Sequence, residues 1–410
     1  MALAALGGCA TNPVTGEREL MLQGESWDRD IGAKQYAPML QSEGGEYDYD
    51  PDLTRYVDSV GQRIAQHADL DLAYEFTVLN NSVPNAWALP GGKIAINRGL
   101  LTELDSEAEL AAVLGHEIVH AAARHGAQQA SRGMLLQGAV VATGMAVQGR
   151  EYGQIVGMGT ALGAQLVSQR YSRDAEREAD YYGMQYMAEA GYDPQGAIDL
   201  QETFVKLSEG RNQDWLSGLF ASHPPSRERL QRNRELAAEL PGGELGRASY
   251  RRKTEHIRAV KPAYEAYEKG VKAASEGQLE QAESLAQRAL SMAPEEARFY
   301  GLRGDIYAAR RRFDAAVNAY DDAIQRDPDW FYFPLRQGIV QRLRNRPQTA
   351  ATALNRSLEL LPTALGHYQL GLVYRSQGNR QQAIQHFQVA SQGQGDVAQK
   401  AQQELEKMQQ

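Results

Sequence analysis

Three columns of identical residues, spaced 34 residues apart, constrain the last third of the chain most strongly. The columns hold glycine, alanine and proline: Gly270, Gly304 and Gly338; Ala282, Ala316 and Ala350; and Pro294, Pro328 and Pro362. Small residues at a fixed period allow helices to pack closely, and proline stops a helix because it lacks an amide hydrogen. This spacing therefore predicts a stack of helix pairs.

A period of 34 residues is that of tetratricopeptide repeats. We expect an α-solenoid of about four units over 263–398, followed by a helical tail at 399–410. The units are expected to start near Ala263, Ala297, Phe331 and Leu365. The register of the fourth unit is the least regular, although its apolar pattern continues through Tyr368, Leu372, Tyr374, Ala383 and Phe387. Such a solenoid offers a concave surface to segments of other proteins.

A second constraint lies upstream, in the pentad His116-Glu117-Ile118-Val119-His120. Ser106 followed by Glu109 predicts a capping box, which would begin the helix that carries the pentad. Residues four apart share a helix face, so both histidines can bind one metal ion. Zinc lowers the pKa of water, and Glu117 is placed to take that water's proton during attack on a carbonyl.

A hydrolytic zinc site needs a third protein ligand and one open position. Glu176 and Asp180 are four residues apart in Ser172-Arg-Asp-Ala-Glu-Arg-Glu-Ala-Asp180, so one can bind the metal while the other orients a ligand histidine. A ligand six residues after His120 is excluded because Gly126 stands there. His125 is one residue away from that position and is expected to pack or cap the helix end.

His-Glu-x-x-His followed by Glu-x-x-Ala-Asp resembles the HtpX and CAAX-prenyl-protease type of zinc endopeptidase, a gluzincin family. The likeness is to a periplasmic branch with C-terminal repeats, and it covers residues 20–240 and the repeats. It implies one zinc ion per chain, Glu117 as general base and Asp180 as the residue that orients a ligand. The implied ligands are His116, His120 and Glu176.

The resemblance implies an α+β fold that is mostly α. A gluzincin metalloprotease domain with a small β-sheet is expected over 22–240, and a linker over 241–262. Within the protease domain the patterns predict helices at 22–42 and 51–68 and a strand at 74–79.

A second short strand, entered through a Gly-Gly break, consists of Lys93, Ile94, Ala95, Ile96 and Asn97. It is either one more strand of the small sheet or an edge strand beside the zinc, to which an extended substrate adds. Both interpretations can hold, and the resemblance favours substrate binding.

His223 stands in a Ser-His-Pro-Pro-Ser226 loop, which can be no more than a turn before a helix capped by Ser226. The family carries a His-Pro at this point, so the resemblance implies an active-site role. Bound to zinc, His223 would hold the enzyme inactive; moved aside, it could stabilise the transition state. Arg170 and Tyr171 are alternative donors.

Residues 134–164 are apolar and rich in glycine, but Gln137 and Arg150-Glu151 interrupt them. A membrane span needs about 20 apolar residues, so we expect close-packed helices or a mobile flap instead. The remaining histidines are expected to have no role in the site: His67, His256, His367 and His386.

The segment 1–21 contains Leu6-Gly7-Gly8-Cys9, which has the shape of a bacterial lipoprotein cleavage box without a full signal peptide before it. Cys9 is the only cysteine, which excludes an intramolecular disulfide. We expect a periplasmic protein tethered to the outer membrane by a lipid on Cys9. A cytosolic enzyme with a free Cys9 thiol is the alternative.

The expected function is that of a zinc endopeptidase of the bacterial cell envelope, which cleaves unfolded or misassembled proteins. The repeats would dock clients or the outer-membrane protein assembly machinery. A chaperone or adaptor with a latent protease site is the rival from another class. The net charge of −9 argues against a nucleic-acid partner.

Overall fold

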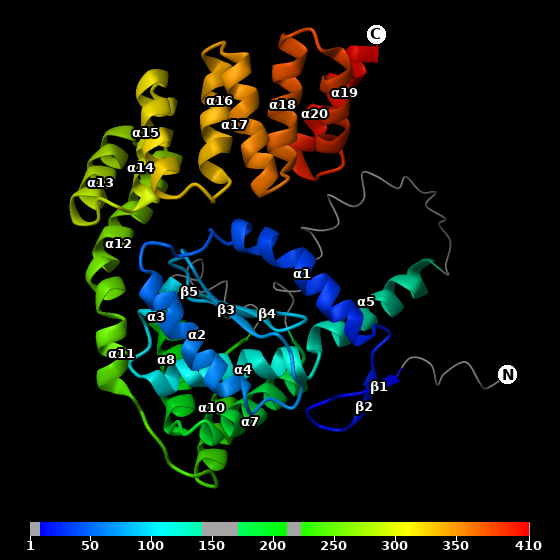
Figure 1. The fold of residues 1–410 in the computed structure, drawn as a ribbon, viewed down its shortest axis with the longest axis vertical. Coiled ribbons are helices and arrows are strands. Elements are labelled where there is room, and N and C mark those ends of the chain that lie inside the picture. The colour runs from blue at the N-terminus through cyan, green and yellow to red at the C-terminus, as the bar shows by residue number, and fades with distance from the viewer. Residues whose placement is uncertain (1–8, 142–170, 211–222, 410) are drawn as a thin grey trace, which may run out of the picture. The chain divides into compact units, whose positions relative to one another are not determined.

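The structure, a computed structural model, describes residues 9–141, 171–210 and 223–409. It divides into two compact units, of which the first runs to Arg258 and the second begins at Ala259. The described residues are mostly helical with two small sheets, which confirms the expected fold class (Figure 1). The boundaries expected at 240 and 262 stay predictions.

The main sheet has three strands, β3 (Glu75–Leu79), β4 (Ala86–Leu89) and β5 (Lys93–Asn97), in the order β3-β5-β4. β5 pairs in parallel with β3 and antiparallel with β4. The expectation that Lys93 to Asn97 form an edge strand is therefore wrong. Both sides of β5 are already hydrogen-bonded, because the chain returns after β4 into the space between β4 and β3.

Helix α1 (Glu25–Ser42) packs on this sheet, where Tyr36, Met39 and Leu40 form a core with Leu79 and Trp87. Helix α2 (Pro51–Ala65) begins at Asp50, whose side chain accepts a hydrogen bond from the Leu53 amide. Both helices lie within the ranges predicted from the apolar spacing, and α3 (Arg98–Leu101) follows β5 directly.

Helix α4 (Glu107–Ala122) carries the pentad and begins at the predicted capping box. The Ser106 hydroxyl oxygen accepts from the Glu109 amide at 3.1 Å, and the Glu109 carboxylate accepts from the Asp105 amide at 3.0 Å. Every residue from Ala108 to Ala122 is buried, because the sheet and other helices surround α4. The pentad therefore lies in the interior of the unit.

Helix α7 (Arg173–Glu189) crosses α4 at a contact between two glycines. A Cβ atom added to Gly183 would lie 2.9 Å from the Gly115 carbonyl carbon and 2.9 Å from the His116 amide nitrogen. The two backbones therefore touch, which no side chain at either position would permit. Asp180 and Glu176, one and two turns before Gly183, face the pentad as a result.

The rest of the first unit comprises the hairpin β1 (Cys9–Thr11) and β2 (Arg18–Leu20), and the helices α5 (His125–Val141), α8 (Gln195–Gly210), α10 (Arg227–Ala237) and α11 (Arg247–Lys253). Cys9 is exposed and has a free thiol. No helix within the described ranges has the length and apolar character to cross a membrane. Residues 142–170 lie outside those ranges, and with them most of the segment 134–164 that was expected to form close-packed helices or a flap.

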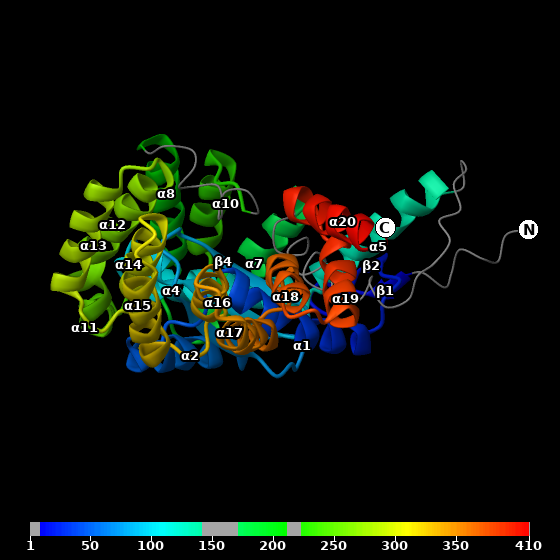
Figure 2. The same ribbon diagram turned by 90° about the horizontal axis from the view of Figure 1, so that it is seen from above.

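The second unit is a row of antiparallel helix pairs (Figures 1 and 2), which confirms the tetratricopeptide prediction. Gly304 and Gly338 are the helix contacts, since a Cβ atom at either would lie 2.6 Å from a side-chain atom of Tyr320 or Leu354. The helices are α12 (Glu255–Ser275), α13 (Leu279–Met292), α14 (Ala297–Ala309), α15 (Phe313–Arg326), α16 (Tyr332–Leu343), α17 (Pro347–Leu360), α18 (Ala364–Ser376), α19 (Arg380–Ser391) and α20 (Gly395–Gln409).

The turn inside each pair contains a residue with positive φ, namely Gly277, Arg311, Asn345 and Gly378. These positions are 34, 34 and 33 residues apart, so the fourth unit is one residue shorter. The missing residue falls in a loop, because α18 starts two residues after Pro362 whereas α14 starts three after Pro294. This deletion explains why the register of the fourth unit was unclear.

Replacing Gly183 with alanine should lower the free energy of unfolding by about 1–3 kcal/mol, because the new methyl group must push α4 and α7 apart. The same change at Gly133, in α5, meets nothing within 4 Å and serves as the control. Urea unfolding of the metal-free proteins measures the free energy of unfolding of both variants. Equal stability of Gly183→Ala and Gly133→Ala would refute the glycine contact.

Candidate metal centre

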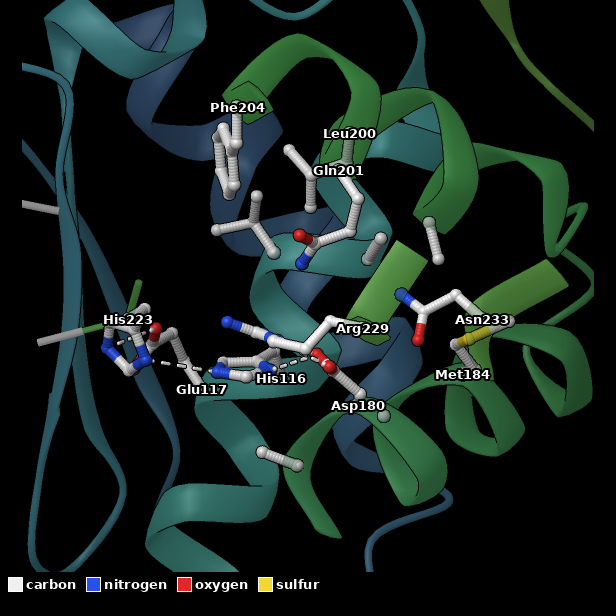
Figure 3. Close-up of a pocket in the computed structure, with 15 residues that line it drawn as sticks. His116, Glu117, Asp180, Met184, Leu200, Gln201, Phe204, His223, Arg229 and Asn233 are labelled. Atoms are coloured by element: carbon white, nitrogen blue, oxygen red, sulfur yellow. Dashed lines mark hydrogen bonds and ion pairs between the residues drawn. The ribbon is translucent and has the colours of Figure 1, made fainter. Parts of the chain in front are cut away.

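Four buried side chains converge between α4, α7 and the segment before α10: His116, His120, Glu176 and His223. One nitrogen or oxygen from each lies within 4.8 Å of all the others. The Nε2 atoms of His116 and His120 are 3.1 Å apart. His223 Nδ1 lies 3.2 Å from His116 Nε2 and 2.8 Å from Glu176 Oε1 (Figure 3 shows His116 and His223).

These separations fit a zinc ion. Ligands of a tetrahedral zinc lie about 3.3 Å from one another, given metal–nitrogen distances of about 2.0–2.1 Å. Two imidazole nitrogens that point their lone pairs at each other repel unless a cation lies between them. The set of three imidazoles and one carboxylate is also a zinc donor set. The structure thus brings the three ligands predicted from the sequence together and adds His223.

His116 is held through the ring nitrogen that points away from the cluster. His116 Nδ1 lies 3.1 Å from Asp180 Oδ1, which leaves Nε2 to face the cluster. Asp180 in turn accepts two hydrogen bonds from Arg229, at 2.7 Å from Nε and 2.6 Å from Nη2. A carboxylate held in this way fixes the orientation of the ring that it contacts. Asp180 therefore occupies the place expected for a residue that orients a ligand.

Arg229 was missed by the sequence analysis. Its Nη1 lies 2.9 Å from Glu176 Oε2 and donates to the Pro224 carbonyl at 3.3 Å. Arg229 therefore contacts both carboxylates of α7 and the residue that follows His223. Arg229 stands three residues after the Ser226 cap, and nothing in the sequence there indicated a role in the site, since arginine is common on exposed helix surfaces. The only clue was that buried carboxylates need a nearby cation.

Burial and neighbouring charges set the protonation of the site in the absence of metal. Burial alone would raise the pKa of both Glu176 and Asp180, but the histidines around Glu176 and Arg229 beside Asp180 outweigh it and lower both. Burial holds the pKa of His120 well below its usual value, so this ligand is neutral. Glu117 differs: burial raises its pKa, and the nearby His223 only partly opposes this.

Glu117 is thus a carboxylate poised to exchange a proton. Its Oε1 lies 3.6 Å from His223 Nε2, and its Oε2 has no hydrogen-bond partner among the residues that the structure describes. Next to it opens a pocket of about 30 Å³, which is large enough to hold water (Figure 3). Leu200, Phe204 and Met184 form part of its apolar wall.

The other predicted residues are placed as follows. The Tyr171 ring stacks on His120, with centroids 3.9 Å apart, and Arg170 lies outside the described residues. His125 packs at the helix end as expected, against His120. No residue of β5 lines the pocket next to Glu117, and the substrate role expected for Lys93 to Asn97 stays a prediction. His67, His256, His367 and His386 are not among the metal-binding cluster.

Fold and site together define a metallopeptidase domain of the gluzincin type. Residues 51–237 match the family model for peptidase family M48, and residues 267–329 and 335–397 match tetratricopeptide repeats. Residues 51–237 are thus an M48 peptidase domain, and the other two ranges are parts of a repeat domain. Zinc is the cofactor that this family implies.

The curated relatives are proteases. The Escherichia coli beta-barrel assembly-enhancing protease is 30% identical over 197 residues, which cover 47% of this chain and 40% of that protein. An Arabidopsis thaliana mitochondrial metalloendopeptidase is 31% identical over 55% of this chain and 43% of its own. The Escherichia coli metalloprotease YcaL is 32% identical over a segment that covers 40% of this chain and 62% of that protein. The chain thus spans less than half the length of the beta-barrel assembly-enhancing protease and of the mitochondrial metalloendopeptidase.

Replacing Arg229 with methionine should lower the free energy of unfolding of the metal-free protein by about 3–5 kcal/mol, because it leaves two buried carboxylates without their cation. The matched control is Arg234→Met on the same helix, whose partner Glu202 is exposed and whose loss should cost about 1 kcal/mol or less. Denaturant unfolding measures both. Similar losses in the two variants would contradict the role given to Arg229.

Proposed function

We propose that this chain is a zinc-dependent endopeptidase of the bacterial cell envelope. The observation that carries the proposal is the convergence of His116, His120 and Glu176 beside the buried carboxylate of Glu117. This arrangement supplies metal ligands and a general base for peptide hydrolysis.

When bound, zinc would act as a Lewis acid on the scissile carbonyl and make water nucleophilic at neutral pH. The residues of the chain supply the rest. His116, His120 and Glu176 hold the ion, and Asp180 and Arg229 hold His116 and Glu176 in place. Glu117 takes the proton from the attacking water at its carboxylate and passes it to the leaving amine. Its raised pKa suits both transfers.

We assign His223 the role of a latch, meaning a fourth ligand that occupies the position needed by water and substrate. Zinc with four protein ligands is closed, whereas a catalytic zinc keeps one position open. The Nδ1 atom of His223 points into the cluster, and Arg229 holds the neighbouring Pro224 carbonyl. Activity then requires the segment around His223 to move away.

The proposed substrates are misassembled or unfolded envelope proteins. The support is the name of relatives in Escherichia coli and Vibrio cholerae, which links those proteases to beta-barrel assembly. The repeats would dock clients or the assembly machinery, as helical solenoids do. A periplasmic location with a lipid on Cys9 completes the proposal. A substrate segment could add to the outer edge of β4, which packs on α4.

Glu117→Gln should retain about one zinc ion per chain but lose casein cleavage by about 10²–10⁴-fold, because the amide cannot accept the proton. Metal analysis and a casein assay on the wild type and the variant measure both quantities. His120→Ala should lose zinc as well as cleavage. A wild type that binds no zinc, or a Glu117→Gln variant that still cleaves, would refute the proposed function.

His223→Ala should bind zinc and cleave casein faster than the wild type, because it frees one coordination position. His67→Ala, which removes a surface histidine that pairs with Glu189, is the matched control and should leave the rate unchanged. Slower cleavage by His223→Ala would contradict the latch and indicate that His223 supports the transition state.

A further inference from the structure

The outer nitrogen of His120 makes a contact that direct coordination of a metal does not account for. His120 Nδ1 lies 2.8 Å from His125 Nδ1, and both rings are buried, each 2% exposed. His120 Nε2 faces the cluster, 3.4 Å from Glu176 Oε1. His125 therefore stands behind His120 as Asp180 stands behind His116.

A break between two helices puts His125 in this position. Helix α4 ends at Ala122 and Ala123 caps it, Arg124 has a φ of 59°, and α5 begins at His125. In an uninterrupted helix, a residue five positions after His120 would point to a different side. Arg124 is held in its left-handed conformation by ion pairing with Asp28 and by donating to the Gln23 carbonyl at 2.8 Å. The reversal brings the two rings together.

The contact continues outward to the N-terminal hairpin. His125 Nε2 lies 3.5 Å from Glu178 Oε1, on α7. The same carboxylate oxygen accepts from Asn12 Nδ2 at 2.8 Å. Asn12 is fully buried, and its Oδ1 accepts from the Val14 amide at 2.9 Å, which fixes the turn of the hairpin. A chain of polar contacts thus links a ligand of the metal centre to the segment that follows Cys9.

Only one proton arrangement satisfies every group in this chain. If His120 binds zinc through Nε2, its proton is on Nδ1 and must be donated to an acceptor, which is His125 Nδ1. The proton of His125 is then on Nε2, which faces Glu178 Oε1 at 3.5 Å. The Glu178 carboxylate has lone pairs and no proton, so it can accept the hydrogen bond from Asn12 and also face the N–H of His125. The partners of a ligand histidine usually fix its tautomer in this way.

We propose that His125 is a positioning residue for His120, held by Glu178 and, through it, by Asn12 of the N-terminal hairpin. The inference rests on the proposed zinc function. It gives the two ligand histidines different supports: a carboxylate contacts His116 directly, whereas an imidazole lies between His120 and its carboxylate. The hairpin of residues 9–20 is then part of the support of the metal centre.

The test is the zinc affinity of purified full-length variants, measured by competition with a chromophoric chelator. His125→Phe keeps a ring but removes the acceptor, and should bind zinc about 10–100-fold more weakly than the wild type. His125→Gln restores an acceptor oxygen and should recover most of the affinity. Glu178→Ala should also weaken binding, whereas Asp174→Ala, which removes an exposed carboxylate from the same helix, should not.

Thermal unfolding of the metal-free variants separates positioning from simple packing. A lower midpoint with unchanged zinc affinity in His125→Phe would overturn the proposal, as would equal affinities for Glu178→Ala and Asp174→Ala. If His125→Phe fails to fold, the Glu178 and Asp174 pair decides the question alone. Absence of zinc binding by the wild type would instead refute the proposed function, so the two failures are distinct.

Discussion

The ion pairs of Arg229 with Asp180 and Glu176 are the interaction on which the site depends. Both carboxylates lie on the face of α7 that packs against α4, where water cannot solvate them. A buried carboxylate without a cation is costly, so the arginine is what allows two of them to remain charged there. The charged form of Glu176 is the form that binds a metal, and the charged form of Asp180 is the form that orients His116.

The same arginine also ties the carboxylates to the segment that carries His223. Its Nη1 contacts both Glu176 and the Pro224 carbonyl. Three carboxylates gather at the centre, and a divalent cation together with Arg229 would balance their charge. Movement of His223 away from the cluster would therefore leave the charge balance intact. A change in coordination need not disturb the electrostatics that hold the carboxylates in place.

Local patterns made much of this structure predictable. The 34-residue columns identify residues where helices touch, and the Ser106 and Glu109 pair marks the start of α4. Spacing of four placed Glu176 and Asp180 on one face. The rest depends on long-range geometry. Alternation identifies β5 as a strand but not its neighbours, and Arg229 and His125 acquire their roles only from side chains that approach from other helices.

The contact of Gly115 with Gly183 limits how this domain can diverge. In most packed interfaces a larger residue on one side can be offset by a smaller one on the other. Here both partners are glycine, the smallest residue, so neither can become smaller to make room for a larger residue at the other position. The crossing of α4 and α7 is consequently closed to compensatory substitution. Divergence that preserves the metal centre has to occur around these two positions and leave both unchanged.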